Sequence, residues 1–207
     1  MLLRQGRLYW VTLDLATDAE ILARQFLSGL SQEHIATLVC SGIEPQTVVD
    51  SMAEDCGPSE LRLFCMPHDA SARLAFTSLA LDLQRTKIAR GSHLVLMLNS
   101  VHLEALSTNQ LQRWCESTRQ WLLSIDCTLL VLCSGQAPLL HQRLSSLNEQ
   151  LSGLAQLYRQ DGAIHYQLNF WHSQLGVCAA QAFDLQASDS GFSLSDSQLS
   201  GPSQTRT

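Results

Sequence analysis

Short hydrophobic runs alternate with amphipathic segments along this chain, and that alternation most limits the folds it can adopt. Five runs are typical of strands: Leu8–Asp14, Ile35–Ser41, Leu61–Met66, His93–Ser100 and Cys127–Ser134. Strands that alternate with helices predict a three-layer α/β domain, in which helices flank a mostly parallel sheet. The run His93–Ser100 is the most hydrophobic, so we expect it to be a central strand covered on both faces.

The first helix is expected directly after the first strand. Thr17-x-x-Glu20 matches a capping box, which predicts a helix that starts near Asp18. Gly29 predicts its end, since glycine commonly follows the last helical turn. The expected core stripe of this helix is Ala19, Leu22, Ala23, Phe26 and Leu30.

Three further helices follow from their end signals and apolar spacing. Pro45 predicts the first turn of a short helix over 45–53, and Asp69 predicts the cap of a helix over 70–84. The clearest helical pattern covers 107–125. Its core face consists of Leu111, Trp114, Thr118, Trp121, Leu122 and Ile125. A later leucine stripe at helical spacing consists of Leu140, Leu144, Leu147, Leu151 and Leu154.

The pattern changes after Gly153. Residues 155–159, 162–173 and 177–187 are typical of strands joined by tight turns, which predicts an antiparallel hairpin extension of the parallel sheet. From residue 188 the sequence is rich in serine and lacks a core stripe. We therefore expect a single domain over 1–187 and a flexible linker or tail over 188–207.

Composition and charge restrict the function classes. The chain has 207 residues, of which 45% are hydrophobic and 15% charged, and a net charge of −6. Its 13 Lys and Arg are scattered without a basic stripe, which argues against nucleic-acid binding. Neither a signal peptide nor a run long enough to cross a bilayer is present, so we expect a cytoplasmic protein without direct membrane insertion. Seven cysteines without a Cys-x-x-Cys pair indicate reduced, buried thiols.

The scaffold is typical of nucleotide-binding proteins, but the residues that bind phosphate are missing. The loop after the first strand, residues 14–20, contains no glycine or lysine and carries three carboxylates, at Asp14, Asp18 and Glu20. A P-loop needs both residue types there, because backbone amides and a lysine hold the phosphates. The strand 93–99 ends in the neutral Asn99, where a magnesium ligand would be an acid. We expect no ATPase activity.

Other catalytic and metal-binding patterns are incomplete. Asp14 resembles an aspartyl nucleophile, but Ala16 replaces the second acid of that motif. Ser41-Gly42 and Ser134-Gly135 hold only fragments of a hydrolase elbow. Cys65-Met-Pro-His68 has half of a zinc-binding spacing without a second pair. We therefore predict no catalytic residue, no cofactor-binding residue and no metal ligand.

Tryptophan is common at the centre of protein interfaces, and this chain contains four. Trp114 and Trp121 lie on the expected core face of the helix 107–125, so burial explains them best. Trp171 lies in the C-terminal hairpin region, near an expected sheet edge. Trp171 is therefore the residue that we predict at a partner interface.

Several segments together resemble the family of N-terminal domains of the bacterial cellulose biosynthesis protein BcsE. Their order and spacing match the family between Gly6 and Phe192. They are Gly6–Asp14, Gly57–Met66, Leu111–Trp121, Cys127–Leu132 and Leu168–Val177. The resemblance implies a degenerate P-loop or RecA-like module of a regulator of cellulose secretion, which agrees with the missing phosphate-binding residues.

The resemblance also implies partners. They are the chain itself as a homodimer, membrane-anchored BcsF, and the cytosolic subunits BcsQ and BcsR, which would recruit it to the inner membrane. In the family, cyclic di-GMP binds a downstream module through Arg-x-Gly-Asp, a motif that this sequence lacks. We thus expect a non-catalytic scaffolding domain in a cyclic di-GMP-dependent pathway. The alternative function is a nucleotide- or cyclic di-GMP-binding module with an atypical site. The sequence is compatible both with an excised fragment of a longer protein and with a naturally short homologue.

Overall fold

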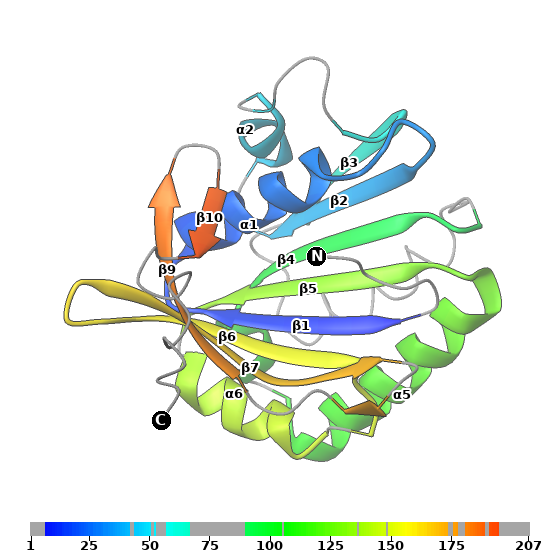
Figure 1. The fold of residues 1–207 in the computed structure, drawn as a ribbon. Helices are drawn as coiled ribbons and strands as arrows, with labels where there is room; N and C mark the ends of the chain where they lie inside the picture. The colour runs from blue at the N-terminus through cyan, green and yellow to red at the C-terminus, as the bar shows by residue number, and fades with distance from the viewer. Residues whose placement is uncertain are drawn as a thin grey trace, which may run out of the picture.

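One mixed sheet organises the fold (Figure 1). The computed structural model describes residues 7–41, 44–50, 52, 57–66, 90–104, 106–135, 137–147, 149–173, 176–177, 181–188 and 191–194. Within these ranges ten strands form a sheet in the order β10-β9-β7-β6-β1-β5-β4-β2-β3, with β8 beside β7. Their bounds are β1 Leu8–Leu13, β2 Ile35–Ser41, β3 Glu60–Met66, β4 His93–Asn99, β5 Thr128–Ser134, β6 Gly153–Gln160, β7 Ala163–Ser173, β8 Gly176–Val177, β9 Gln181–Ser188 and β10 Gly191–Leu194.

The five strands predicted from the first two-thirds of the sequence are confirmed as β1 to β5, with ends that differ by at most one residue. They are mutually parallel in the order β1-β5-β4-β2-β3. The predicted central strand, β4, lies between β5 and β2, and its residues 93–98 are buried. The continuous apolar sequence of β4 therefore predicted correctly that the strand is buried on both faces.

The predicted antiparallel hairpin over 155–159 and 162–173 is confirmed as β6 and β7, although β6 starts two residues earlier than expected. β6 begins at Gly153 and runs parallel to β1, with Leu154 opposite Trp10. The antiparallel extension starts only at β7, which pairs with β6 and then with β9. A single crossover from β5 thus adds a sixth parallel strand before the turn at Asp161-Gly162. Both residues of that turn have positive φ (51° and 82°), as a tight hairpin turn requires.

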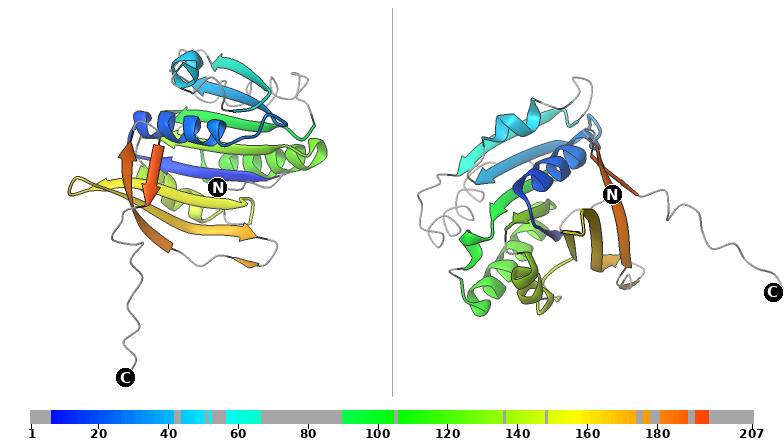
Figure 2. Two further views of the ribbon diagram at one scale, coloured as in Figure 1. Left: turned by 45° about the horizontal axis from the view of Figure 1, so that its top comes forward. Right: turned by 90° about the vertical axis from the view of Figure 1, so that its left-hand side faces the viewer.

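Helices cover both faces of the sheet, as expected for three layers (Figure 2). Their bounds are α1 Ala16–Ser28, α2 Pro45–Val49, α4 Val101–Glu104, α5 Thr108–Ile125 and α6 Ala137–Ser145. α1 and α2 pack over Tyr9 and Val11 in one core layer. α5 and α6 pack over Leu8 and Trp10 in the other. The helix predicted over 70–84 lies outside the described residues.

The start of α1 differs from the prediction. The helix begins at Ala16, and its N-cap is Leu15, whose side chain makes no capping hydrogen bond. Thr17 is therefore not a cap, and the expected capping box with Glu20 does not form. The helix ends at Gly29 as predicted. Its buried face is rotated toward Asp18 and Leu27, neither of which the predicted core stripe included.

α5 matches its predicted pattern closely. The Ser107 side chain accepts a hydrogen bond from the Gln110 backbone N–H, and the Gln110 side chain accepts one from the Ser107 backbone N–H, which completes a capping box. The core face is confirmed, with Cys115 as an additional buried member. α6 is shorter than its leucine stripe implied. The helix ends at Ser145, and Leu147, Leu151 and Leu154 remain buried beyond it because the connection and β6 continue under the same layer.

The last described strand corrects the domain boundary predicted at residue 188. Gly191–Leu194 form β10, which pairs with β9, and Phe192 is buried against α1. The Gln25 side chain holds β10 by donating to the Phe192 carbonyl (2.9 Å) and accepting from the Phe192 N–H (3.1 Å). The φ of Gly191 is 137°, which favours glycine, and a Cβ there would lie 2.7 Å from Gln25 Cδ. The serines around this strand concealed its apolar alternation.

Candidate functional site

The carboxyl ends of β1 and β5 form the topological switch point of the parallel sheet. The chain leaves β1 through α1 toward β2, whereas it leaves β5 through α6 toward β6 on the other side of β1. Open α/β sheets bind ligands in the crevice at such a point. Leu13 lies opposite Ser134, and Ser134 lies opposite Asn99 of β4. The loops that follow these three residues are the candidate functional site.

An internal ion pair occupies the loop after β1. Asp18, in the first turn of α1, is fully buried, and its carboxylate accepts two hydrogen bonds from the Arg159 guanidinium, at 2.6 and 3.2 Å. Asp14 accepts a further bond from the Arg159 backbone N–H at 2.9 Å. The hydrogen bond to Asp18 is the main cause that raises the pKa of Arg159, so the guanidinium stays charged. An anionic side chain therefore lies near the helix N-terminus, where a phosphate would be stabilised by the helix dipole.

Backbone hydrogen bonds also close the ends of β4 and β5. Gly135 N–H donates to the Leu13 carbonyl at 3.0 Å, and Ser100 N–H donates to the Ser134 carbonyl at 2.7 Å. A Cβ at Gly135 would lie 2.5 Å from Ser100 Oγ, and the φ of Gly135 is 107°. The Asn99 side chain accepts the N–H of Val101 at 3.1 Å, so its oxygen serves the start of α4. The backbone groups and the Asn99 side chain at these strand ends thus form hydrogen bonds within the protein that fix the loops.

Two histidines lie on the side of the sheet that carries α6. His141 of α6 is buried, and its Nδ1 lies 3.1 Å from Thr12 Oγ1 of β1. His165 of β7 stacks on Tyr158, and its Nδ1 lies 2.8 Å from Asp184 Oδ1. Both histidines thus join neighbouring elements through polar contacts, and these pairs contain no serine or cysteine nucleophile.

Two of the buried thiols, Cys40 and Cys115, are poorly suited to nucleophilic chemistry. Burial raises the pKa of Cys40 to about 12, with smaller contributions from Cys65 and Glu20. Burial also raises the pKa of Cys115 to about 12. The prediction of buried thiols is confirmed at Cys40, Cys115, Cys127 and Cys133. Cys65 is an exception, since it is exposed on β3.

The remaining sequence candidates are placed only in part. Trp114 and Trp121 pack against the core layer under α5, as predicted, and Trp114 meets the fully buried Trp10 edge-to-face at 5.9 Å. The backbone of Trp171 pairs with Gly153 of β6. Its side chain lies outside the described part of the chain, so the predicted interface role of Trp171 stays a prediction. The same holds for His68 of the half zinc motif. Among the described residues, no group of three or more His, Cys, Asp or Glu could hold a metal ion.

Sequence reasoning missed the Asp18–Arg159 pair. The two residues are separated by 141 positions, and nothing in the sequence signals their contact. An acid in the first turn of a helix is common for dipole reasons alone, so the position of Asp18 at a predicted helix start does not indicate a buried contact. A correct parallel register for β6 would have suggested Arg159, because β6 is the neighbour of β1 and continues beyond its end.

Comparison with known proteins identifies the family. The family described as cellulose biosynthesis protein BcsE, N-terminal domain, matches residues 1–193. The chain belongs to the BcsE N-terminal domain family. The match covers all strands of the sheet that the structure describes up to Ser193.

Full-length relatives of this family carry one name. The chain is 27% identical over 197 residues to "Cyclic di-GMP binding protein BcsE" of Klebsiella pneumoniae subsp. pneumoniae, with 91% of this chain and 36% of that protein aligned. Identity to the protein of the same name is 29% in Salmonella typhimurium strain LT2 and 23% in Escherichia coli K12, over 92% and 93% of this chain. The chain thus spans about a third of the length of these relatives, 36% in each case. None of the helices that the structure describes is long and apolar enough to cross a membrane.

Proposed function

We propose that this chain is a non-catalytic interaction domain of a bacterial cellulose secretion system that cyclic di-GMP regulates. The observation that carries the proposal is the Asp18–Arg159 ion pair at the switch point of the sheet. It places a buried carboxylate near the helix end where nucleotide-binding relatives of this architecture hold a phosphate. Family membership supports the link to cellulose secretion.

The P-loop or RecA-like origin of the fold is part of this proposal. In its favour, β1 is an interior strand followed directly by α1, and the carboxyl ends of β1, β5 and β4 lie side by side. The loop after β1 has lost the glycines and lysine of a phosphate loop. We infer an ancestral nucleotide-binding scaffold in which polar contacts within the chain have replaced the ligand contacts.

The partners that we propose are those that the family resemblance implies: BcsQ with BcsR, membrane-anchored BcsF, and a second copy of this chain. Curated relatives are named for cyclic di-GMP binding. We assign that binding to parts of those proteins outside this region, because the sequence contains no Arg-x-Gly-Asp. The alternative, an atypical nucleotide or cyclic di-GMP site in this domain, is disfavoured by the carboxylates around the switch point.

Light scattering after size exclusion tests the proposal. The chain would be run alone, then mixed with purified BcsQ–BcsR, and then with a peptide of the cytosolic part of BcsF. The proposal predicts a dimer or a co-eluting complex in at least one run. A monomer in every run, with no co-elution at micromolar concentrations, would overturn the interaction role.

A further inference from the structure

Exposed aliphatic side chains gather at the carboxyl edge of the parallel strands. Five large hydrophobic side chains in the described part of the chain are exposed: Leu15, Phe64, Val101, Leu123 and Leu139. Leu15 follows β1, Val101 follows β4 and Leu139 lies in the first turn of α6 after β5. Because β1, β5 and β4 are adjacent and end in register, these three residues lie at the same edge of the sheet. We call Leu15, Val101 and Leu139 the carboxyl-edge patch.

The three side chains of the patch are largely exposed to solvent. The exposed fractions are 44% for Leu15, 60% for Val101 and 61% for Leu139. Single exposed aliphatic residues are ordinary, but several that converge on one edge mark an interaction site more often than chance exposure does. Each of the three stands next to a loop that internal hydrogen bonds fix, so the patch is presented on a rigid base.

The charge around the patch indicates which partner fits. The described strand ends and loops at this edge, residues 14–20, 41, 44–46, 99–104, 134–135, 137–139 and 159–163, contain no lysine and a single arginine, Arg159. The described side chains in these segments include five carboxylates, Asp14, Asp18, Glu20, Glu44 and Asp161. Arg159 is paired with the buried Asp18, so these two charges balance each other, and the net negative charge comes from the other four carboxylates. The edge is therefore both apolar and strongly acidic.

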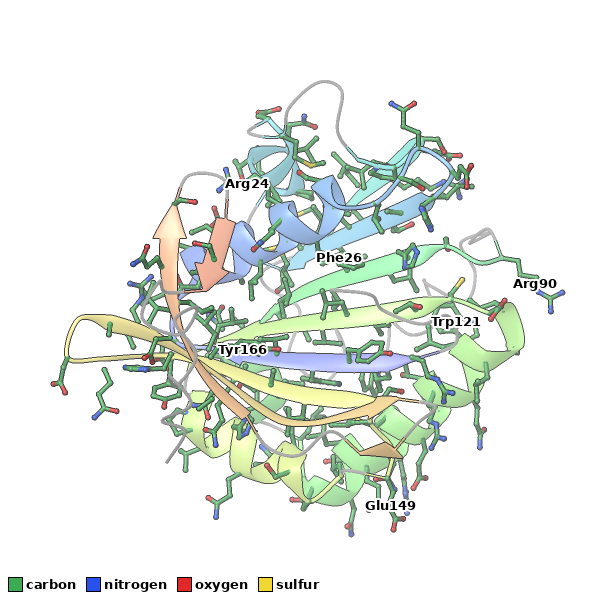
Figure 3. All side chains as sticks on the ribbon, in the orientation of Figure 1. Arg24, Phe26, Arg90, Trp121, Glu149 and Tyr166 are labelled. Atoms are coloured by element: carbon green, nitrogen blue, oxygen red, sulfur yellow. The ribbon has the colours of Figure 1, made fainter. Side chains whose placement is uncertain are left out.

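The acidic groups lie on both sides of the patch. Asp161 is exposed at the tip of the β6–β7 hairpin, which projects beyond the other strand ends at the left of Figure 1 and of the left view in Figure 2. Glu44 is exposed on the far side, after β2, which neighbours β4. Arg90 and Trp121 lie at the opposite edge of the sheet, at the right of Figure 3. Arg7 and Arg90 precede β1 and β4 there.

We propose that the carboxyl-edge patch is a docking surface for a basic amphipathic helix of a partner protein. The apolar face of such a helix would cover Val101, Leu139 and Leu15, and its lysines or arginines would meet Glu44 and Asp161. This inference rests on the proposed interaction function and names the surface and the chemistry of the partner. It differs from the prediction at Trp171, which belongs to β7.

Designed peptides test the surface directly. The probe is an 18-residue helical peptide with leucines at helical spacing on one face and lysines on the other, and the control carries glutamates in place of the lysines. Fluorescence anisotropy would measure binding of each to the full chain. We expect the lysine peptide to bind at least tenfold more tightly than the glutamate peptide, with affinity falling as salt rises.

Surface variants locate the binding. Leu139→Asp and Val101→Asp should each weaken binding of the lysine peptide at least tenfold, whereas the matched control Leu123→Asp, exposed on α5, should not. Glu44→Gln with Asp161→Asn should reduce the salt dependence. Circular dichroism would verify that each variant folds, which is expected because these side chains are exposed. Equal binding of both peptides, no binding at 1 mM, or wild-type affinity of both Asp variants would overturn the inference.

The same variants separate this inference from the proposed function. If BcsQ–BcsR or BcsF co-elutes with the wild type and equally with Leu139→Asp and Val101→Asp, the interaction role holds and the carboxyl-edge surface is wrong. If nothing co-elutes with the wild type, the interaction role fails whatever the peptides do.

Discussion

At the scale of single residues, Asp18 and Arg159 join the start of α1 to the end of β6 at the switch point of the sheet. The Asp18 side chain is fully buried, whereas 38% of the Arg159 side chain is exposed. Removing either partner therefore has unequal consequences. A buried carboxylate without its cation keeps its full desolvation cost, but a half-exposed guanidinium can turn to water.

Arg159→Met should consequently destabilise the protein more than Asp18→Asn does. We expect losses of about 3 kcal/mol for Arg159→Met and about 1 kcal/mol for Asp18→Asn in the free energy of unfolding. Urea denaturation measures both. The matched control is Arg62→Met, which breaks the exposed 2.6 Å pair with Glu60 and should cost about 0.5 kcal/mol or less. Similar losses for all three variants would show that Asp18 is not the internal anion of this site.

His93 should make stability depend on pH. It is buried at the start of β4 beside His34 and Phe26, with ring centroids 5.0 and 6.0 Å away. Burial, and to a lesser extent His34, lowers the pKa of His93 below its ordinary value. The unfolded chain therefore binds a proton at His93 more readily than the folded chain does. This contribution to the free energy of unfolding is complete at neutral pH and is lost as the pH falls below about 6.5. His93→Leu should flatten the stability profile between pH 7.5 and 5.5 in urea titrations. An unchanged slope in this variant would contradict the assignment.

At the scale of elements, helix caps show where sequence signals are reliable. Ser107 and Thr17 both precede a matching Gln or Glu by three residues, but only Ser107 forms a capping box. The difference is tertiary, because Asp18 must turn inward to Arg159, and this sets the start of α1 at Ala16. Capping motifs describe local preference, which a buried contact from a distant strand overrides.

Ser107→Ala should therefore destabilise the protein by about 1 kcal/mol, the usual value of an N-cap, whereas Thr17→Ala should have little effect. Urea denaturation of the two variants side by side makes the comparison. Equal losses would mean that α1 does use Thr17 as a cap.

The β10 strand is held to α1 by one side chain. Gln25→Ala removes both hydrogen bonds to Phe192, at 2.9 and 3.1 Å, and should cost about 2 kcal/mol. Hydrogen exchange should quicken in β9 and β10 but not in β1 or β5. Gly191→Ala should also destabilise, because its Cβ would meet Gln25. The double variant should lose less than the sum of the two, since Gln25→Ala removes the atoms that clash. Strict additivity would exclude this contact.

At the scale of the whole molecule, the sequence predicted the parallel sheet well and its far side poorly. β1 to β5 were recognisable because buried parallel strands are continuous apolar runs. The β6–β7 hairpin was also recognisable, but the parallel pairing of β6 with β1 was not, because strand order depends on crossovers that leave no local pattern. The leucines between Leu140 and Leu154 have helical spacing, but they belong in turn to a helix, a connection and a strand that all pack into one core layer. At the candidate site, the carboxylates that follow β1 could be read from the sequence, but the ion pair between Asp18 and Arg159 could not.

The measurement that tests the central claim most directly is thermal unfolding of the chain with millimolar ATP or GTP plus magnesium, and with cyclic di-GMP. A ligand that binds the native state stabilises it by about 2.7 kcal/mol at one hundred times its dissociation constant, which raises the midpoint by several degrees. We predict no shift with any of the three, because carboxylates at Asp14 and Asp18 occupy the switch point. A reproducible rise that Arg159→Met abolishes would show that the site still binds nucleotide, and would contradict the account of a domain closed from within.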